Sequence, residues 1–317
     1  MKLLIVTQRV DRTDPILGFF HRWIEGFAKN CESVTVIGQY VGEYNFPKNV
    51  HVYSLGKEDK LFRWRQIIRF WNYQLILNKK YDTVLVHMTP IWVILGAPIW
   101  KLLRKKIHLW YEVRRGRWYL PIAIRLVKHV FSATPNGLPN PCKKQRVLGH
   151  GIDIDFFKPN AAKKENGLVA TVGRITPVKH LDIVIRAFAA LPQTCRLVIA
   201  GDAFISRDKQ EKKKLVSLIA ELGIADRVQM GFMQHNEVQS LLQRAELFLH
   251  ACEGGLDKVI LEAMASGCLV LSTSVSAKDV LPEKCIATFD SFTERTQAIL
   301  NLSTEEQVSI SNNLRTT

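Results

Sequence analysis

The stretch "HACEGGLDKVILEAMASGCLVLSTS", residues 250–274, carries the clearest fold signal in this chain. An apolar run ends at its first residues and "LVLSTS" closes it, and both are typical of buried strands. Between them, Asp257 is a good helix N-cap, residues 258–266 have helical character and Gly267 is a typical helix stop. A strand, a helix and a second strand in this order predict one βα unit of a parallel sheet.

The same alternation of short β-branched runs and longer helical patterns extends along the whole chain. It predicts an α/β fold of two doubly wound sheets in tandem. The expected strands are "KLLIVT", "SVTVIG", "VHVYSL", "TVLVHM", "IHLWYEV" and "VFSAT", then "GLVATVG", "RLVIAG", "VQMGF", "LFLHA", "LVLSTS" and "CIATF". A polar stretch at 156–167 is typical of a linker, so we expect one domain over residues 1–158 and another over 159–317.

The composition is that of a soluble globular protein, with 47% apolar and 23% charged residues. The longest apolar run, residues 91–100, is too short to cross a bilayer, and the opening apolar stretch is too short for a signal peptide. We therefore expect a cytoplasmic protein. Its six cysteines are scattered without a C-x-x-C pair, which favours reduced thiols over disulfides or zinc.

The positive charge lies in the first half of the chain. Residues 1–158 hold 26 Lys/Arg against 11 Asp/Glu, whereas residues 159–317 hold 18 of each. All seven tryptophans also lie in the first half. A basic, Trp-rich domain suits an anionic surface such as a membrane, a phosphate-bearing acceptor or a nucleic acid. No recognised nucleic-acid motif accompanies the charge, so we expect no nucleic-acid partner.

The segment "LFRWRQIIRFWNYQLIL", residues 61–77, has two interpretations. On a helical wheel it has one apolar stripe, made of Leu61, Trp64, Ile67, Ile68, Trp71 and Leu75. The stripe alone indicates core packing. Three arginines share the remaining face with Phe62 and Phe70, which is typical of a helix that lies on a membrane surface. The sequence leaves both open.

A first candidate site follows the strand "GLVATVG". Gly173 ends that strand, and Arg174 and Lys179 lie in the loop before an amphipathic helix. A glycine lets the backbone approach a ligand, an arginine offers a fork for phosphate oxygens and a lysine adds a point charge. Together they fit a diphosphate at the edge of a sheet, although two solvated surface cations would have the same sequence.

A second candidate site is the turn in the opening stretch. Gly254 and the glycine after it place the first amides of the following helix at the end of a strand, which favours an anion or a sugar hydroxyl. Glu262 lies one turn into that helix, four residues after Lys258. The alternatives are an ordinary helix ion pair for Glu262 and a solvated loop acid for Glu253.

The order "GR…K", "AGD" and "GLDKVILEAMASG" resembles the donor half of the family 4 retaining glycosyltransferases of the GT-B fold. "HGIDIDFFKP" is similar to the segment that joins their two domains, and the first half more loosely resembles their acceptor domain. The resemblance implies two Rossmann-like domains facing across a cleft. It also implies transfer of a sugar, with retention, from a UDP- or GDP-linked donor and without a metal.

By position, the resemblance makes Arg174 and Lys179 the residues that bind and stabilise the departing diphosphate. It assigns ribose binding to Glu262. It also places Gly18 in a glycine-containing loop whose backbone amides approach the donor. The full donor set that it implies is Gly18, Gly173, Arg174, Lys179, Gly231, Phe232, Glu253, Gly254, Asp257, Lys258, Val259 and Glu262.

The sequence departs from the family pattern in three places. Gly254 stands where the first acid of the Glu-x7-Glu pattern is expected, and Val113 stands where the family usually has a histidine. The family usually continues with a long C-terminal helix, which we expect to be truncated in this chain. The role of that histidine then falls to another side chain such as His21 or Glu112, and the expected acceptor side is Asp11, His21, Glu112 and Arg114.

Two functions are therefore expected from the sequence. The first is a glycosyltransferase acting on a glycolipid or polysaccharide precursor of the cell envelope, cytoplasmic or peripheral on the inner face of the membrane. Its partners would be a nucleotide-sugar, an acceptor glycan or lipid-linked sugar, and an anionic membrane surface. The alternative is a GT-B scaffold that binds a nucleotide-sugar and is catalytically weak or inactive.

Overall fold

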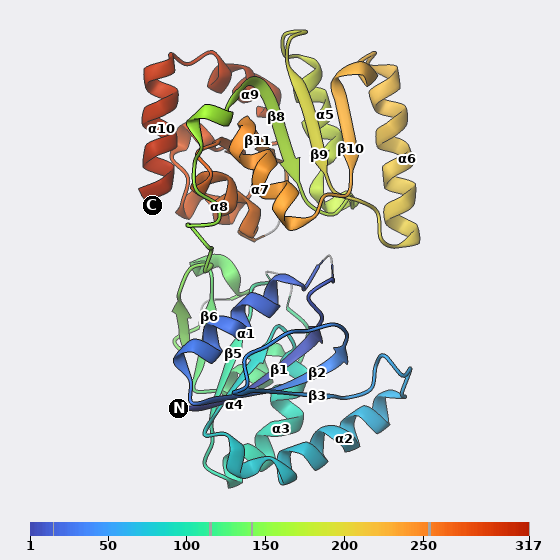
Figure 1. The fold of residues 1–317 in the computed structure, drawn as a ribbon, viewed down its shortest axis with the longest axis vertical. Coiled ribbons are helices and arrows are strands. Elements are labelled where there is room, and N and C mark those ends of the chain that lie inside the picture. Colours follow the sequence, from blue (N-terminus) through green and yellow to red (C-terminus); the bar gives the residue numbers. More distant parts are fainter. Residues whose placement is uncertain (15, 114–115, 141, 253–254, 317) are drawn as a thin grey trace. The chain divides into compact units, whose positions relative to one another are not determined.

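The computed structural model describes residues 1–316 apart from 15, 114–115, 141 and 253–254. The chain divides into two compact units, Met1–Leu148 and Gly149–Thr317 (Figure 1). The division falls before the stretch that we expected to be a linker. Phe157, inside that stretch, is 1% exposed and belongs to the hydrophobic core of the second unit. Residues 149–158 therefore belong with the second unit and not with the first.

The first unit contains a parallel sheet with the strand order β3-β2-β1-β4-β5-β6-β7. Its strands are β1 (Lys2–Val10), β2 (Ser33–Val41), β3 (Val50–Ser54), β4 (Thr83–His87), β5 (Lys106–Trp110), β6 (His129–Ser132) and β7 (Gln145–Val147). The order reverses between β1 and β4, as in doubly wound folds, where ligands bind beyond the carboxyl ends of the strands.

Helices cover both faces of this sheet. They are α1 (Phe19–Asn30), α2 (Arg63–Ile76), α3 (Pro90–Leu102) and α4 (Leu120–Leu126), with short 3₁₀ turns η1 (Asn78–Lys80) and η2 (Pro135–Gly137). Alternate residues of β1 enter different cores: Leu4 packs in the core that includes residues of α2, α3 and α4, whereas Ile5 packs in the core of α1. This alternation is what a strand with two buried faces requires.

The second unit has a parallel sheet in the order β10-β9-β8-β11-β12. Its strands are β8 (Glu165–Val172), β9 (Arg196–Ala200), β10 (Val228–Gly231), β11 (Ala245–His250) and β12 (Leu269–Ser272). Its helices are α5 (Leu181–Ala189), α6 (Ser206–Glu221), α7 (His235–Arg244), α8 (Lys258–Ala265), α9 (Phe292–Leu300) and α10 (Thr304–Thr316). The 3₁₀ turns are η3 (Ala161–Lys163), η4 (Pro177–Lys179), η5 (Ala225–Arg227), η6 (Val275–Asp279) and η7 (Glu283–Cys285).

The expected α/β alternation is confirmed, with two differences at strand level. Strand β7 was not predicted, because a three-residue edge strand is too short to show a hydrophobic period. The predicted strand "CIATF" is wrong: Cys285 ends a 3₁₀ turn, and Ile286 makes an isolated bridge to Ser272. Within the described residues, no helix has both the length and the apolar character needed to cross a membrane.

Candidate functional site

The predicted donor residues of the second unit gather at the carboxyl edge of its sheet. Backbone hydrogen bonds connect the ends of three neighbouring strands there, from Gly173 N to Ala200 O (3.0 Å) and from Gly201 N to Gly231 O (2.8 Å). A Cβ on Gly201 would lie 1.8 Å from the carbonyl oxygen of Gly173. The loops after β8 and β9 therefore approach so closely that position 201 requires glycine.

Lys179 connects the loop after β8 to the start of α8. It ends the turn η4, and the next residue, His180, has a positive φ of 40° that directs the chain into α5. The ammonium of Lys179 forms an ion pair with Oδ2 of Asp257, and the Lys179 side chain is 22% exposed. The two residues are 78 positions apart in sequence and meet because β8 and β11 are neighbours in the sheet.

Asp257 has a second partner on the neighbouring strand. His250 Nε2 lies 2.7 Å from Asp257 Oδ2, and His250 Nδ1 lies 3.0 Å from the hydroxyl of Ser272. Burial raises the pKa of Asp257, but Lys179 and His250 outweigh it and hold that pKa well below its usual range. Burial lowers the pKa of Lys179, and Asp257 more than compensates, so that pKa is raised. Both members of the pair are charged at neutral pH.

Asp257 differs in one respect from the role predicted for it. It occupies the N-cap position of α8, but its side chain makes no cap hydrogen bond. The carboxylate turns toward Lys179 and His250 instead. The first-turn amides of α8 thus keep their partial positive charge without a capping carboxylate, which suits an anionic ligand.

Arg174 has an acidic partner that the sequence did not reveal. Its Nε lies 3.5 Å from Oδ2 of Asp208, in the first turn of α6. Asp208 is fully buried, whereas the Arg174 side chain is 39% exposed. The charge of Arg174 also acts to lower the pKa of Lys179, so the two predicted phosphate-binding cations lie near each other.

Lys258 and Glu262 lie on α8 at the spacing of a helix ion pair. Burial lowers the pKa of Lys258 to about 7, and Glu262 acts against this shift. This interaction is the ordinary (i, i+4) ion pair that was the alternative explanation for Glu262. It does not test the ribose-binding role of Glu262, which stays a prediction.

His150 lies near Lys258, and burial and that charge lower the pKa of His150 to about 4. Its Nε2 lies 3.0 Å from the carbonyl oxygen of Leu256.

Two exposed aromatic rings lie next to the ends of β9 and β10. Phe232, a predicted donor residue, is 54% exposed, and Phe204 is 39% exposed. Their ring centroids are 6.3 Å apart in an edge-to-face arrangement. The sequence signal for Phe204 is an aromatic residue two positions after the strand end "AGD".

Gly18 and Asp11 lie in the loop of the first unit between β1 and α1. Gly18 has ordinary helical dihedral angles, and a Cβ there would lie 2.5 Å from the carbonyl oxygen of Asp14. Glycine is therefore required by close backbone approach. The carboxylate of Asp11 accepts hydrogen bonds from Thr13 N (3.0 Å) and the Thr13 hydroxyl (2.7 Å), which forms a local turn.

His21 and Glu112 are both engaged in structural contacts. His21 Nε2 accepts a hydrogen bond from Asn45 N (3.1 Å), and burial lowers the pKa of His21. Glu112 accepts hydrogen bonds from Ala133 N (2.6 Å) and the Thr134 hydroxyl (3.1 Å). Burial raises the pKa of Glu112. Both side chains hold loops together, so these contacts do not favour either as the replacement for the missing histidine.

The remaining predicted residues are placed in part. Val113 is 38% exposed after the end of β5, and Val259 is partly buried in the first turn of α8. Glu253, Gly254 and Arg114 lie outside the described residues.

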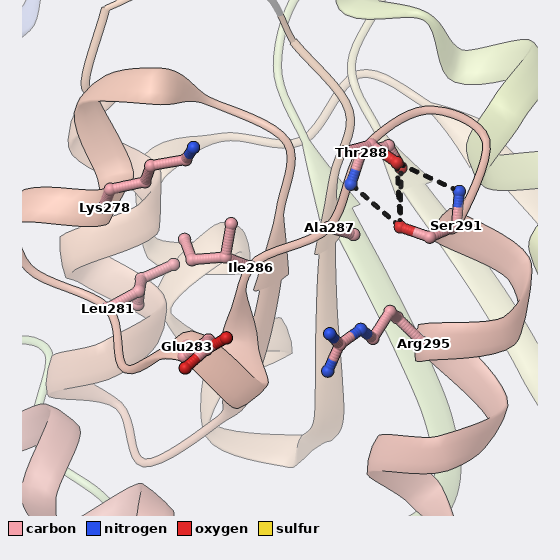
Figure 2. Close-up of a pocket in the computed structure, with 8 residues that line it drawn as sticks. All are labelled: Lys278, Leu281, Glu283, Ile286, Ala287, Thr288, Ser291 and Arg295. Carbon is pink, nitrogen blue, oxygen red and sulfur yellow. Dashed lines mark hydrogen bonds between the residues drawn. The ribbon is translucent and has the colours of Figure 1, made fainter.

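A cavity of about 390 Å³ lies elsewhere in the second unit, between η6, η7 and α9 (Figure 2). It is lined by Lys278, Leu281, Glu283, Ile286, Ala287, Thr288, Ser291 and Arg295. Figure 2 shows Thr288 and Ser291 hydrogen-bonded to each other, with 2.9 Å between their hydroxyls. None of the predicted donor residues that the structure describes lines this cavity. We therefore place the candidate site at the sheet edge and not here.

Three potential metal ligands also meet at the sheet edge. The ligand atoms of His250, Cys252 and Asp257 lie within 4.8 Å of one another. Asp257 Oδ2 in this group already contacts the ammonium of Lys179.

The comparison with protein families falls on this unit. Residues 153–280 match the family model of glycosyl transferases group 1. The matched segment contains Arg174, Lys179, Asp208, Asp257 and Glu262.

Curated relatives match a similar share of the chain. The D-inositol 3-phosphate glycosyltransferase of Mycobacteroides abscessus is 34% identical over 145 residues, which are 42% of this chain and 32% of the relative. The enzyme of the same name from Mycobacterium bovis is 35% identical over 145 residues, with 42% and 30% covered. The match thus spans about a third of the length of these relatives.

Solved structures match over the full chain. The Anabaena protein Alr3699/HepE in complex with UDP and glucose has a TM-score of 0.79 and 17% identity, over 100% of this chain and 94% of that one. WaaG, a glycosyltransferase involved in lipopolysaccharide biosynthesis, has a TM-score of 0.70 and 17% identity, with 99% and 94% covered. These likenesses show the fold: two parallel-sheet α/β units of the GT-B type.

Proposed function

We propose that this protein is a glycosyltransferase that moves a sugar from a nucleotide-sugar to an acceptor with retention of configuration. The observation that carries the proposal is the meeting of Arg174, Lys179 and the start of α8 at one sheet edge, inside the segment that matches glycosyl transferases group 1. Two cations and a helix N-terminus suit a departing diphosphate, whose charge they would stabilise as it develops.

The donor is a UDP- or GDP-linked sugar in this proposal. Support comes from the structural neighbour that is in complex with UDP and glucose. The exposed rings of Phe204 and Phe232, at the ends of neighbouring strands, offer an apolar surface for the base. Glu262 would accept hydrogen bonds from ribose hydroxyls, because a carboxylate can bind two vicinal hydroxyls at once.

The acceptor is a glycolipid or polysaccharide precursor in this proposal. The excess of Lys/Arg in residues 1–158 favours an anionic or lipid-linked acceptor over a neutral one. A structural neighbour acts in lipopolysaccharide biosynthesis, which is consistent with that class. Retention rests on the motif resemblance, and the anomeric coupling constant of the product would test it.

The test is release of nucleoside diphosphate from a panel of UDP- and GDP-sugars, with and without acceptor lipid extracts. Release with one donor supports the proposal, and absence of release with every donor contradicts it.

We propose further that Lys179 makes a metal unnecessary, because its ammonium contacts the carboxylate of the potential ligand group. Turnover should then survive EDTA, and loss of turnover that Mg²⁺ or Mn²⁺ restores would refute this part.

Arg174→Ala tests the residue assignment. It should lower donor turnover by a factor of about 10²–10³, as for other groups that stabilise charge in the transition state. The same change leaves the buried carboxylate of Asp208 without its arginine, so a loss of folding could give the same result. Arg174→Lys separates the two effects, because it keeps the charge near Asp208 and removes the guanidinium fork. If the folded Arg174→Lys variant turned over donor at the wild-type rate, the guanidinium fork would not be needed for the reaction.

One observation favours the alternative of a binding scaffold. Lys179 is already paired with Asp257, and Arg174 with Asp208, so both cations have carboxylate partners before any ligand arrives. Such a protein would bind nucleotide-sugars and release no diphosphate. A thermal shift with UDP or GDP, combined with absence of release in the panel, would establish this second function.

A further inference from the structure

Helix α2 presents its apolar stripe to the outside. The exposed fractions of Trp64, Ile68, Trp71 and Leu75 are 56%, 47%, 41% and 58%. Their spacing of four, three and four residues places them on one face of the helix. Core packing was one of the two explanations that the sequence left open for this stripe, and it is wrong for these four residues. Figure 1 shows α2 along the lower margin of the first unit.

The opposite face of α2 is fixed to the core by specific contacts. Phe70 is fully buried, and its ring centroid lies 4.7 Å from that of Trp92. Gln74 is also fully buried, and its Oε1 accepts hydrogen bonds from the Tyr81 hydroxyl (3.0 Å) and from Trp100 Nε1 (2.6 Å). A rotation of α2 that buried the apolar stripe would break these buried hydrogen bonds, which is costly. The outward orientation is therefore built into the unit.

The surroundings of the stripe are strongly basic. Residues 60–111 contain ten Lys/Arg and a single Asp/Glu, Asp82. The guanidinium of Arg65 lies 5.1 Å from the centre of the Trp64 ring. Apolar exposure continues at both ends of the helix, with Phe62 at 70% and Ile76 at 74%. Aromatic and aliphatic side chains bordered by cations are the pattern of a helix that lies in a membrane interface.

We infer that the outer face of α2, defined by Trp64, Ile68, Trp71 and Leu75, docks on a bilayer that contains anionic lipids. Charge complementarity selects this occupant. A second copy would bring an equally basic face and would be repelled, whereas an anionic bilayer offers an apolar interior and attracts Lys and Arg. The inference concerns the first unit alone and holds whether or not the protein transfers sugars.

Vesicle co-sedimentation of the full chain tests the inference. We expect binding to vesicles of phosphatidylcholine with phosphatidylglycerol, weaker binding as salt rises, and little binding to phosphatidylcholine alone. The double variant Trp64→Ser/Leu75→Ser should weaken binding by about ten-fold or more, because it removes two inserted apolar groups. Arg63→Gln/Arg65→Gln should also weaken binding by about ten-fold, since each lost cation reduces attraction to the anionic surface.

Matched controls come from the second unit. Val216→Ser/Val308→Ser removes apolar side chains that are 55% and 52% exposed on α6 and α10, and it should leave binding unchanged. Lys209→Gln/Lys213→Gln removes two exposed cations of α6 and is the control for charge. Circular dichroism and melting temperature show whether each variant is folded.

Three outcomes would overturn the inference. They are absence of binding to the phosphatidylglycerol vesicles, equal binding by folded Trp64→Ser/Leu75→Ser, and equal binding to neutral vesicles. A dimer in lipid-free solution that Trp64→Ser/Leu75→Ser dissociates, measured by light scattering, would instead assign the face to a second copy.

Discussion

At the scale of single residues, Asp257 occupies a helix N-cap position while its carboxylate binds partners outside that helix. It lies at the N-cap of α8, where its carboxylate could bind the helix's own amides, and instead it binds Lys179 and His250. Local sequence specified the N-cap position. The two partners come from the loop after β8 and from β11, which the sheet brings together.

Asp257→Asn should destabilise the fold by about 1–3 kcal/mol at neutral pH, at the lower end because the side chain is 34% exposed. The pKa of Asp257 is held below its ordinary value of 3.8, so the stabilisation is fully present above that value and is lost as the pH falls below it. Urea unfolding should thus show a constant difference between wild type and variant above about pH 5, and a smaller one in acid. Exposed Asp226→Asn is the control. Equal stability of wild type and Asp257→Asn at neutral pH would refute the ion pair's contribution.

Lys258 gives a prediction on binding. Burial lowers its pKa to about 7, so a large fraction of this side chain is neutral at physiological pH. A diphosphate at the start of α8 would favour the charged form, so binding of UDP should take up protons and weaken as the pH rises through 7. Calorimetry in two buffers of different ionisation enthalpy measures this uptake. Lys258→Met should remove it, and proton uptake that persists in this variant would assign it to another group.

At the scale of elements, two glycines have different physical roles. Gly267 ends α8 with a φ of +76°, in agreement with the predicted helix stop. Gly26 lies within α1, and a Cβ there would meet no atom within 4 Å. The first position requires the left-handed conformation, and the second only lacks a side chain.

The pair Gly267→Ala and Gly26→Ala should change stability in opposite directions. Gly267→Ala forces a Cβ into the left-handed region, 3.2 Å from Pro159 Cβ, and should cost about 1–2 kcal/mol. Gly26→Ala should stabilise by about 0.5–1 kcal/mol, because alanine favours the helix. Denaturant midpoints of the two variants measure both effects. Destabilisation by Gly26→Ala would show that its surroundings are tighter than the structure indicates.

At the scale of the whole molecule, the two units differ in charge and have separate cores. The core of the second unit is built from residues between Phe157 and Leu314, and those of the first from residues before 149. Each unit has the buried apolar surface of a domain that can fold alone.

Residues 149–317 expressed alone should therefore unfold in one cooperative urea transition. A shorter piece, residues 159–317, lacks Phe157, which is 1% exposed in that core. It should be less stable by about 3–5 kcal/mol, as when a buried phenylalanine is truncated. Equal stability of the two pieces would place the boundary at the position that the sequence predicted, after residue 158.

Local sequence was enough to predict the parallel α/β alternation, the stop at Gly267 and the cations that follow β8, because hydrophobic period and capping depend on residues a few positions apart. Three features required the folded chain: Lys179 contacts Asp257, Arg174 contacts Asp208, and α2 turns its stripe outward. These features depend on which distant elements become neighbours in a sheet or core. The direction of α2 follows from buried contacts with Tyr81 and Trp100, which a helical wheel does not contain.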